Sequence, residues 1–437
     1  MGGKKEKPDV DFAFKTVSRH SPLATRHSIW ALVLLFAAVP GFSDAPKDSC
    51  VTCHASLEGD LAKPAQAFAT DVHHQAGLSC ASCHGGDPND DSMDAMSPAR
   101  GFRGAPKRTQ IPEFCARCHS DESAMRRFNP KLRTDQLSQY RTSVHGKRLK
   151  QGDTKVATCV DCHSVHNILA VSDTRAPVYP TNVASTCARC HADPQYMQGY
   201  KIPTDQAAKY QKSVHAETLA QGDTSAPTCT TCHGNHGATP PGVGSVANVC
   251  GTCHVFFAQL FDKSPHNAAF AAAGLPGCVQ CHSNHEVLHP SDDWVGVGSK
   301  SVCGNCHAQG DQGYAAAETM SSDLAKLKDS YHRAEDILNT AERSGMEVSS
   351  AKLELGDANE DLVKARVNVH TFRAEEVQKL TDQGVEISQK AHGAGVAALR
   401  ERDLRRKGLG LSLIFIVLAI SGLYWKIRQI ESRAGGS

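Results

Sequence analysis

Hydrophobic residues recur with a heptad spacing in the C-terminal part of the chain. Alternating steps of four and three residues link a first set, Met320, Leu324, Leu327, Tyr331, Ala334, Leu338 and Ala341. After a break at Ser344 and Gly345, the same spacing links Val348, Ala351, Leu355, Ala358, Leu362, Ala365, Val369 and Phe372. This period predicts long amphipathic helices that share a hydrophobic seam. We therefore expect an antiparallel pair of long helices over residues 311–407, with a third helix that starts near Val385.

Two continuous apolar runs lie near the ends of the chain. The run 408–425 has no charged residue, and at ~1.5 Å per residue it spans about 27 Å, which predicts one transmembrane helix with Tyr424 and Trp425 at the interface and a short tail, 426–437. The run from Ile29 to Val39 is too short to span, follows a basic leader and precedes small residues. It predicts a signal peptide over residues 1–45, with an uncleaved anchor as the alternative.

Basic residues lie on both sides of the predicted span. The upstream side has five, Arg400, Arg402, Arg405, Arg406 and Lys407, and the downstream side has three, Lys426, Arg428 and Arg433. The positive-inside rule alone would place the upstream part of the chain in the cytoplasm. This expectation conflicts with the export signal.

Residues 46–310 have no long helical period and instead contain an internal repeat. The segments 140–166, 210–236 and 261–285 align with one another, and a degenerate copy begins at Thr70. Loops rich in Gly and Pro, such as residues 238–245, separate the copies. We expect short helices, long loops and few strands in this region.

The cysteine pattern gives these repeats a chemistry. All 18 cysteines fall in nine Cys-x-x-Cys-His words: Cys50/Cys53/His54, Cys80/Cys83/His84, Cys115/Cys118/His119, Cys159/Cys162/His163, Cys187/Cys190/His191, Cys229/Cys232/His233, Cys250/Cys253/His254, Cys278/Cys281/His282 and Cys303/Cys306/His307. Zinc sites and disulfides do not require a histidine directly after the second cysteine. Covalent attachment of c-type haem does, because both sulfurs bind the porphyrin and the adjacent imidazole binds the iron.

In these nine words the chain resembles a multihaem c-type cytochrome. The resemblance implies nine covalent haem c groups (iron), attached outside the cytoplasm and used to pass electrons. Each repeat contains one word near its end and is followed by a second, plainer word, so the nine words form one leading word, at Cys50, plus four two-haem units. The 6% aromatic content is low, and we infer that the porphyrins supply much of the buried apolar material.

Further histidines recur at fixed places in the repeats and are candidate distal ligands. His166, His236 and His285 each lie three residues after a word, while His145, His215 and His266 occur in Ser-x-His words, with His73 or His74 in the degenerate copy. Nine irons need nine distal ligands, and candidates for the two still missing are His74, His289, His332, His370 and His392. We favour His332 and His370, because each follows directly after a seam residue.

The predicted fold is mainly α with extensive loops. A nonahaem cytochrome c domain (46–310) precedes a long helical segment (311–407), the span (408–425) and a cytoplasmic tail (426–437). Lys and Arg number 47 against 46 Asp and Glu, so the net charge is close to zero and does not predict nucleic-acid binding.

The predicted function is electron conduction by a protein anchored in the inner membrane, with its haem domain in the periplasm. Its partners would be redox proteins, a quinol-oxidising membrane subunit or the quinol pool itself, together with membrane lipid. Two alternatives stay open: a reductase of nitrogen or sulfur oxyanions, and a haem-bearing subunit of a respiratory complex. The layout of haems before long helices is similar to that of pentahaem nitrite reductases, hydroxylamine oxidoreductases and octahaem tetrathionate reductases. Those enzymes keep one haem with an open distal position, whereas the histidines here suffice for every iron.

Overall fold

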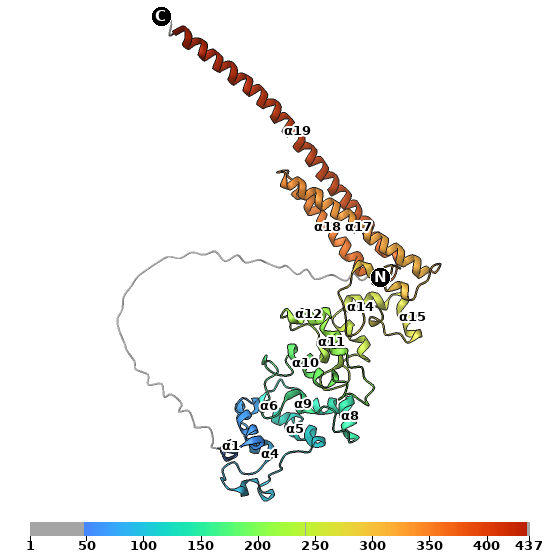
Figure 1. Cartoon of the computed structure of the whole chain (residues 1–437). Coiled ribbons are helices and arrows are strands. Elements are labelled where there is room, and N and C mark those ends of the chain that lie inside the picture. The colour runs from blue at the N-terminus through green and yellow to red at the C-terminus, as the bar shows by residue number, and fades with distance from the viewer. Residues whose placement is uncertain (1–47, 241, 435–437) are drawn as a thin grey trace, which may run out of the picture. The chain divides into compact units, whose positions relative to one another are not determined.

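The computed structural model describes residues 48–240 and 242–434, and within these residues the fold consists of helices and loops without a β-strand (Figure 1). This confirms the mainly helical fold class. The signal peptide predicted over residues 1–45 lies outside the described residues and stays a prediction.

The first part of the described chain, which we call the haem region (48–310), is built from short helices. No α-helix here is longer than the 12 residues of α10. The α-helices are α1 Ser49–Ala55, α2 Lys63–Phe68, α3 Val72–Gln75, α4 Cys80–His84, α5 Ile111–His119, α6 Glu122–Phe128, α7 Gln136–Thr142, α8 Val144–Lys150, α9 Cys159–His163, α10 Pro180–His191, α11 Gln206–Gln211, α12 Val214–Ala220, α13 Cys229–His233, α14 Val255–Asp262, α15 Pro265–Ala273 and α16 Val279–His282. The 3-10 helices are η1 Gly59–Leu61, η2 Met93–Met96, η3 Pro98–Arg100, η4 Arg108–Gln110, η5 Val246–Thr252, η6 Asp292–Trp294 and η7 Cys303–Asn305.

The repeated Ser-x-His word is a helix start. The Ser143 hydroxyl accepts a hydrogen bond from the Gly146 N–H at 3.0 Å, and Ser213 caps α12 in the same way. A serine N-cap satisfies a backbone donor that the first helical turn leaves free. It also fixes the following histidine at the second position of the helix.

A repeated tyrosine, three residues before that serine, forms a hydrogen bond to the backbone just before the next Cys-x-x-Cys-His word. The Tyr140 hydroxyl donates to the Ala157 carbonyl at 2.8 Å, and Tyr210 donates to the Pro227 carbonyl at 2.8 Å. Both carbonyls lie just before a Cys-x-x-Cys-His word. The repeated Tyr and Ser therefore hold a histidine and a haem-attachment word in a fixed relation.

The second part is a three-helix bundle made of α17 Gln312–Arg343, α18 Ser349–Asn368 and the first half of α19 Ala374–Ala434, with η8 Val369–Thr371 between α18 and α19. One buried cluster contains residues from the first half of α17, the end of α18 and the start of α19: Met320, Leu324, Leu327, Leu362, Ala365, Val377 and Val385. A second contains Ala334, Leu338, Ala341, Val348, Leu355, Ala358 and Ala391. Neighbouring helices are therefore antiparallel, as the heptads predict. The third helix begins at Ala374, earlier than the expected Val385.

Two glycines of α19 allow the helices to approach closely. A Cβ at Gly384 would lie 2.7 Å from Leu327 Cδ1, and a Cβ at Gly395 would lie 2.8 Å from Ile337 Cγ2. Real Cβ atoms do not come this close to other heavy atoms. The small residues thus bring α19 into tight contact with α17.

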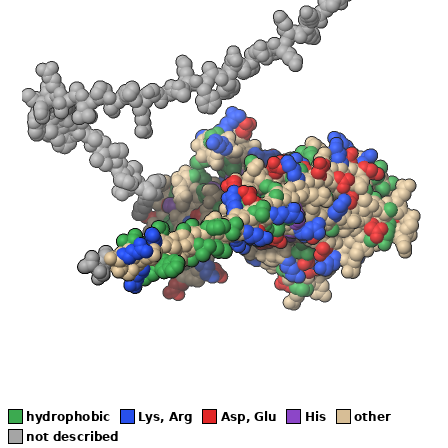
Figure 2. All heavy atoms as spheres, turned by 90° about the horizontal axis from the view of Figure 1, so that it is seen from above, with side chains coloured by type: hydrophobic (Ala, Val, Ile, Leu, Met, Phe, Trp, Pro, Cys, Tyr) green, Lys and Arg blue, Asp and Glu red, His purple; other side chains and the backbone are tan. Residues whose placement is uncertain are grey.

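Beyond the bundle, α19 continues without interruption as an exposed apolar helix. It is the one helix among the described residues that is long and apolar enough to cross a membrane, with a mean hydropathy of 2.0 over its most apolar window and none of that window buried. In Figure 2 this part shows hydrophobic side chains along its visible face, with Lys and Arg side chains near its end. The predicted span is thus a continuation of the bundle helix.

Asp292 of η6 joins the two parts. Its carboxylate accepts two hydrogen bonds from Arg366 of α18, each of 2.8 Å, and lies 3.5 Å from the Lys328 ammonium of α17. The hydrogen bonds from Arg366 hold the pKa of Asp292 below its usual value, against the effect of partial burial. Val295 packs against the first bundle cluster beside this ion pair.

Candidate haem-binding sites

The Cys-x-x-Cys-His words form short helical turns. Helices α4, α9 and α13 each run from the first cysteine of a word to its histidine, while α5 and α10 end at His119 and His191. Residues three apart lie on one face of a helix, so both sulfurs point the same way. The histidine follows at the C-terminal end of the turn.

The second cysteines of the words differ in how far the protein encloses them. Four of them are exposed, namely Cys53, Cys118, Cys253 and Cys306, whereas the first cysteine of every word is half-buried. Cys190 is half-buried as well, with Tyr196 beside it, and burial together with this thiol raises the pKa of Tyr196. Haem attachment stays a prediction from the words themselves at all 18 cysteines, Cys53, Cys118, Cys190 and Cys253 included.

The structure brings eight of the nine word histidines next to a second histidine. The ring centroids are 5.9 Å apart for His73 and His119, 6.1 Å for His84 and His166, 6.0 Å for His145 and His191, 6.1 Å for His163 and His236, 6.4 Å for His215 and His254, 6.0 Å for His233 and His285, 5.8 Å for His266 and His307, and 6.0 Å for His282 and His370. Each pair combines one word histidine with one candidate distal ligand.

This spacing fits a haem iron between the two rings. Histidine–metal bonds are about 2.0 Å long and a ring centroid lies roughly 1 Å beyond the ligating nitrogen, so two imidazoles on opposite faces of one metal have centroids about 6 Å apart. Rings in direct van der Waals stacking would lie closer. The residues present therefore fit the cofactor that the cysteine words imply.

The pairs follow two rules. A word that begins a unit pairs with the histidine of the next unit: His84 with His166, His163 with His236, and His233 with His285. A word that ends a unit pairs with the Ser-x-His histidine, or with His73, of its own unit. His282 has no following unit, and His370 of η8 takes the place of the missing histidine. The bundle thus supplies the second imidazole for His282, the histidine of the first word in the last unit.

Ring orientation separates the two kinds of pair. The first-word pairs are close to parallel, with interplanar angles of 28°, 15°, 16° and 9°. The second-word pairs are tilted or nearly perpendicular, with angles of 82°, 51°, 38° and 77°. If these rings hold iron, the two kinds of site would differ in electronic state, because the angle between the two imidazole planes affects a ferric haem.

Hydrogen bonds fix which ring nitrogen faces the partner ring. Nδ1 of His84 lies 3.0 Å from the Gly104 carbonyl oxygen, and Nδ1 of His370 lies 2.9 Å from that of Val367. Nδ1 of His73 lies 2.8 Å from an Asp71 carboxylate oxygen. An Nδ1–H that donates to oxygen leaves Nε2 free to bind a metal. The sequence patterns did not reveal these three hydrogen-bond acceptors, which orient the histidine rings.

Burial favours the neutral form of the paired rings. It lowers the pKa of His145, His163, His236, His282 and His370 below the ordinary value for histidine. Loss of hydration penalises the charged imidazolium. A neutral imidazole is the form that binds iron.

The remaining histidines have other surroundings. Within residues 48–240 and 242–434, no second imidazole lies against His54, whose Nδ1 lies 3.0 Å from the Leu61 carbonyl oxygen. His74 packs against Phe68, and the exposed His289 lies 3.7 Å from Glu217. His392 lies partly buried in α19 without a described ring partner.

His332, which the heptad made a candidate ligand, is not placed beside a second imidazole by the structure, within the residues that it describes. Its side chain is 57% exposed on α17 and lies 3.5 Å from Glu335, away from every word histidine described. His370 follows an equivalent seam position but lies in η8, at the end of the bundle that meets the haem region. The two residues differ in their position along the bundle: His332 lies within α17, and His370 lies at the end nearest the haem region. The heptad pattern contains no information about that position.

Consecutive words are neighbours through their sulfurs. The adjacent Cys115 thiol raises the pKa of Cys159, Cys229 raises that of Cys187, and Cys278 raises that of Cys250, in each case with burial as a second cause. Within units, burial is the first cause of the raised pKa of Cys83, Cys162, Cys232 and Cys281, and the charge of a second-word thiol is a further cause. In the first two words, burial and the Asp48 carboxylate raise the pKa of Cys80, and the Cys50 thiol is a further cause. The nine words therefore form an uninterrupted series.

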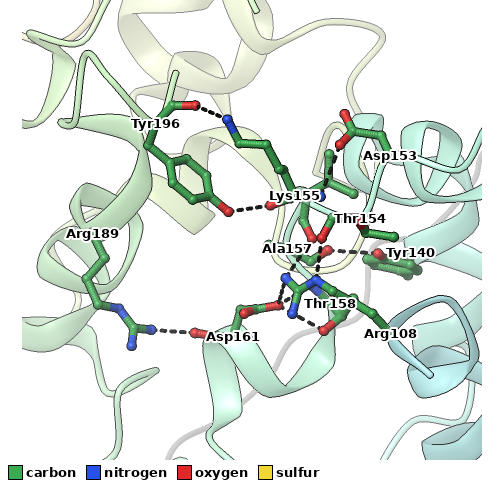
Figure 3. Close-up of polar contacts among 11 residues, drawn as sticks. Arg108, Tyr140, Asp153, Thr154, Lys155, Ala157, Thr158, Asp161, Arg189 and Tyr196 are labelled. Carbon is green, nitrogen blue, oxygen red and sulfur yellow. Dashed lines mark hydrogen bonds and ion pairs between the residues drawn. The ribbon is translucent and has the colours of Figure 1, made fainter. Parts of the chain in front are cut away.

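Arg108 organises the contact between two units (Figure 3). Its guanidinium donates to the carbonyls of Thr154 and Val156 at 2.6 and 2.9 Å and to the Asp161 carboxylate at 2.8 Å. Partial burial opposes ionisation of Asp161, but hydrogen bonds from Thr158 and Arg108 outweigh it and lower the pKa. Arg108 therefore anchors α9, which carries the word at Cys159.

Arginines within two second words reach back to the first word of the same unit. Arg117 donates to the Cys83 carbonyl at 2.7 Å, and Arg189 donates to the Asp161 carbonyl. Charge-assisted hydrogen bonds of this kind are stronger than neutral ones. They hold the two words of a unit together.

Comparisons with known proteins agree with these sites. Residues 72–192 match the cytochrome c3 family, and residues 40–85 match the family of cytochrome c554 and c-prime. The multiheme cytochrome MtrA of Shewanella baltica (strain OS185) is 26% identical over 309 residues, which cover 61% of this chain and 78% of the relative. No solved structure matches the chain. The matches and the cysteine words support a multihaem c-type cytochrome with covalently bound haem c and a role in electron transport.

Proposed function

We propose that this multihaem c-type cytochrome carries nine haems and conducts electrons along them, anchored by α19 in the inner membrane with the haem region in the periplasm. Redox partner proteins would supply and remove the electrons. The observation that carries this proposal is the set of eight imidazole pairs, in each of which a word histidine lies 5.8 to 6.4 Å, between ring centroids, from a histidine elsewhere in the chain.

Each haem would be held by residues of one word and one distant histidine. The two cysteines of a word attach the porphyrin and its histidine binds one face of the iron. The paired histidine, such as His236 for the word at Cys159, binds the opposite face. Bound haem c supplies an iron that cycles between the ferric and ferrous states, while the buried imidazoles stabilise both states and exclude exogenous ligands.

Ligation between units favours conduction over catalysis. Because His166, His236 and His285 would each complete an iron attached to the preceding unit, they hold neighbouring porphyrins close together. A pair of protein ligands also leaves no position for a substrate on eight of the nine irons. The leading word at Cys50 is the place where the reductase alternative would have to be sought.

The membrane assignment rests on α19. Its most apolar window is long enough to span and is not buried within the chain. Haem attachment outside the cytoplasm outweighs the opposite charge bias, so Ser437 would be cytoplasmic. The five basic residues from Arg400 to Lys407 would then lie among the outer headgroups.

Electron transfer out of the fully reduced, purified chain tests the proposal. We expect rapid oxidation by a soluble oxidised cytochrome c, and no sustained consumption of nitrite, hydroxylamine or tetrathionate when a reductant is supplied continuously. Multiple turnovers with any of the three small substrates would contradict the proposal and favour the reductase.

A further inference from the structure

The three-helix bundle has the geometry of a stalk. Helix α19 begins at Ala374, three residues after η8, and the apolar run begins at Gly408. At 1.5 Å per residue, about 50 Å of continuous helix separate η8 from the start of the span. The headgroup layer occupies less than 10 Å of this distance.

Side-chain contacts show that α19 is supported along this length. Near η8, Lys326 of α17 lies 3.7 Å from Asp382 of α19. Farther along, Lys390 of α19 lies 2.7 Å from Glu354 of α18. At the far end, Arg402 donates to the Ser344 hydroxyl at 3.1 Å, in the turn that joins α17 and α18. The supported part thus reaches almost to the span.

The haem-facing residues lie at the opposite end of the bundle from the span. His370 is in η8, and His307 precedes the start of α17. Asp292 and Val295, which join the haem region to the bundle, contact Arg366, Lys328 and the cluster near η8. The paired histidines nearest the bundle are therefore at its membrane-distal end.

Charge along the bundle favours an upright stalk. Residues 312–399 contain 15 acidic and 10 basic side chains, whereas residues 400–407 contain five basic and two acidic ones. Anionic headgroups attract the basic stretch and repel the remainder of the bundle. A bundle lying flat on the membrane would place its acidic surface against the headgroups.

We propose that the bundle holds the haem region roughly 40 Å above the membrane headgroups, so that electrons are exchanged with a redox protein whose cofactor lies outside the bilayer. The quinol pool itself is then not a direct partner. Tunnelling rates fall exponentially with distance, and the bundle contains no Cys-x-x-Cys-His word to bridge the gap. This inference rests on the membrane anchoring and electron transfer proposed above, and it selects among the partners considered there.

Electron microscopy of the full, haem-loaded chain in nanodiscs that contain anionic lipid tests the geometry. We expect the haem region to be separated from the disc surface by the length of the bundle. Haem density in contact with the disc in most particles would overturn the stalk. This readout is independent of any electron-transfer activity.

Vesicles that contain the full chain and a reduced quinone as sole donor test the partner. We expect no haem reduction within the time in which a soluble reduced redox protein, added to the same vesicles, reduces the haems completely. Rapid reduction by the quinol alone would overturn the inference. Failure of both donors would instead contradict the electron-transfer function, so the two failures are distinguishable.

Discussion

The haem region and the bundle are both helical, but different interactions hold them together. In the bundle, Leu324, Leu327 and Leu338 are fully buried between long helices. In the haem region the helices are short, and the buried hydrophobic side chains are mostly small, with Leu149 and Leu219 among the few larger ones. The bundle therefore has a core of its own side chains, and we expect the haem region to depend on its cofactor for a core.

The largest expected effect follows from preventing haem attachment. In chain produced without haem attachment, we expect residues 312–402 to keep slow amide exchange and residues 48–310 to exchange rapidly. Hydrogen exchange read by mass spectrometry measures both regions in one sample. If the haem region of the haem-free chain exchanged as slowly as that of the haem-loaded chain, the region would not depend on its cofactor for a core.

Replacing His370 tests the point where the two regions share a site. His370→Leu should leave the iron at Cys278/Cys281 open on one face, because the bundle no longer supplies an imidazole. We expect a new high-spin ferric signal and CO binding on reduction, with the covalent haem content unchanged.

His332→Leu is the matched control, since His332 follows the equivalent seam position but points to solvent. It should leave the spectrum unchanged. If His370→Leu also leaves the spectrum unchanged, the bundle does not ligate haem.

Two glycines of α19 test packing within the bundle. A Cβ at Gly395 would lie 2.8 Å from Ile337, whereas nothing lies within 4 Å of one at Gly393. Gly395→Ala should lower the free energy of unfolding of the bundle by about 1–3 kcal/mol through overpacking. Gly393→Ala should raise it by roughly 0.5–1 kcal/mol through helix propensity. Chemical denaturation followed by circular dichroism measures both, and equal signs would refute the tight contact.

The smallest effect on the haem sites is expected at Arg108, which supports the haem region without touching a paired histidine. Arg108→Gln should destabilise the contact between units by about 1–3 kcal/mol, because hydrogen-bond acceptors lose a charged donor. Amide exchange around residues 154–161 should rise while the haem spectrum stays the same. Arg126→Gln, which removes an exposed ion pair with Glu122, should change little.

The sequence predicted the bundle because heptads report burial directly. Of the first seam, six of the seven residues are buried and Tyr331 is partly buried. The start of the third helix was misplaced, because Val377 and Thr381 extend the seam of α19 toward Ala374 without an unbroken apolar pattern.

The haem words and the recurring histidines were also readable, since fixed spacing and repetition are local signals. The sequence could not show which candidate distal histidine lies beside which word histidine. The pairing of His84 with His166 depends on how successive units stack, as does the location of His370. The roles of Asp71, Arg108 and Arg117 depend on contacts between residues far apart in the chain, and no local pattern encodes them.

The most direct test of the account is EPR spectroscopy, with magnetic circular dichroism, of the oxidised full chain with quantified spins. The account predicts low-spin, bis-imidazole iron at the eight paired sites and at most one iron of another kind. The four near-parallel pairs should give ordinary rhombic signals, and the most tilted pairs, His73/His119 and His266/His307, should give signals with a large highest g value. Two or more high-spin irons in fully loaded protein, or thioether ligation at any paired site, would contradict it.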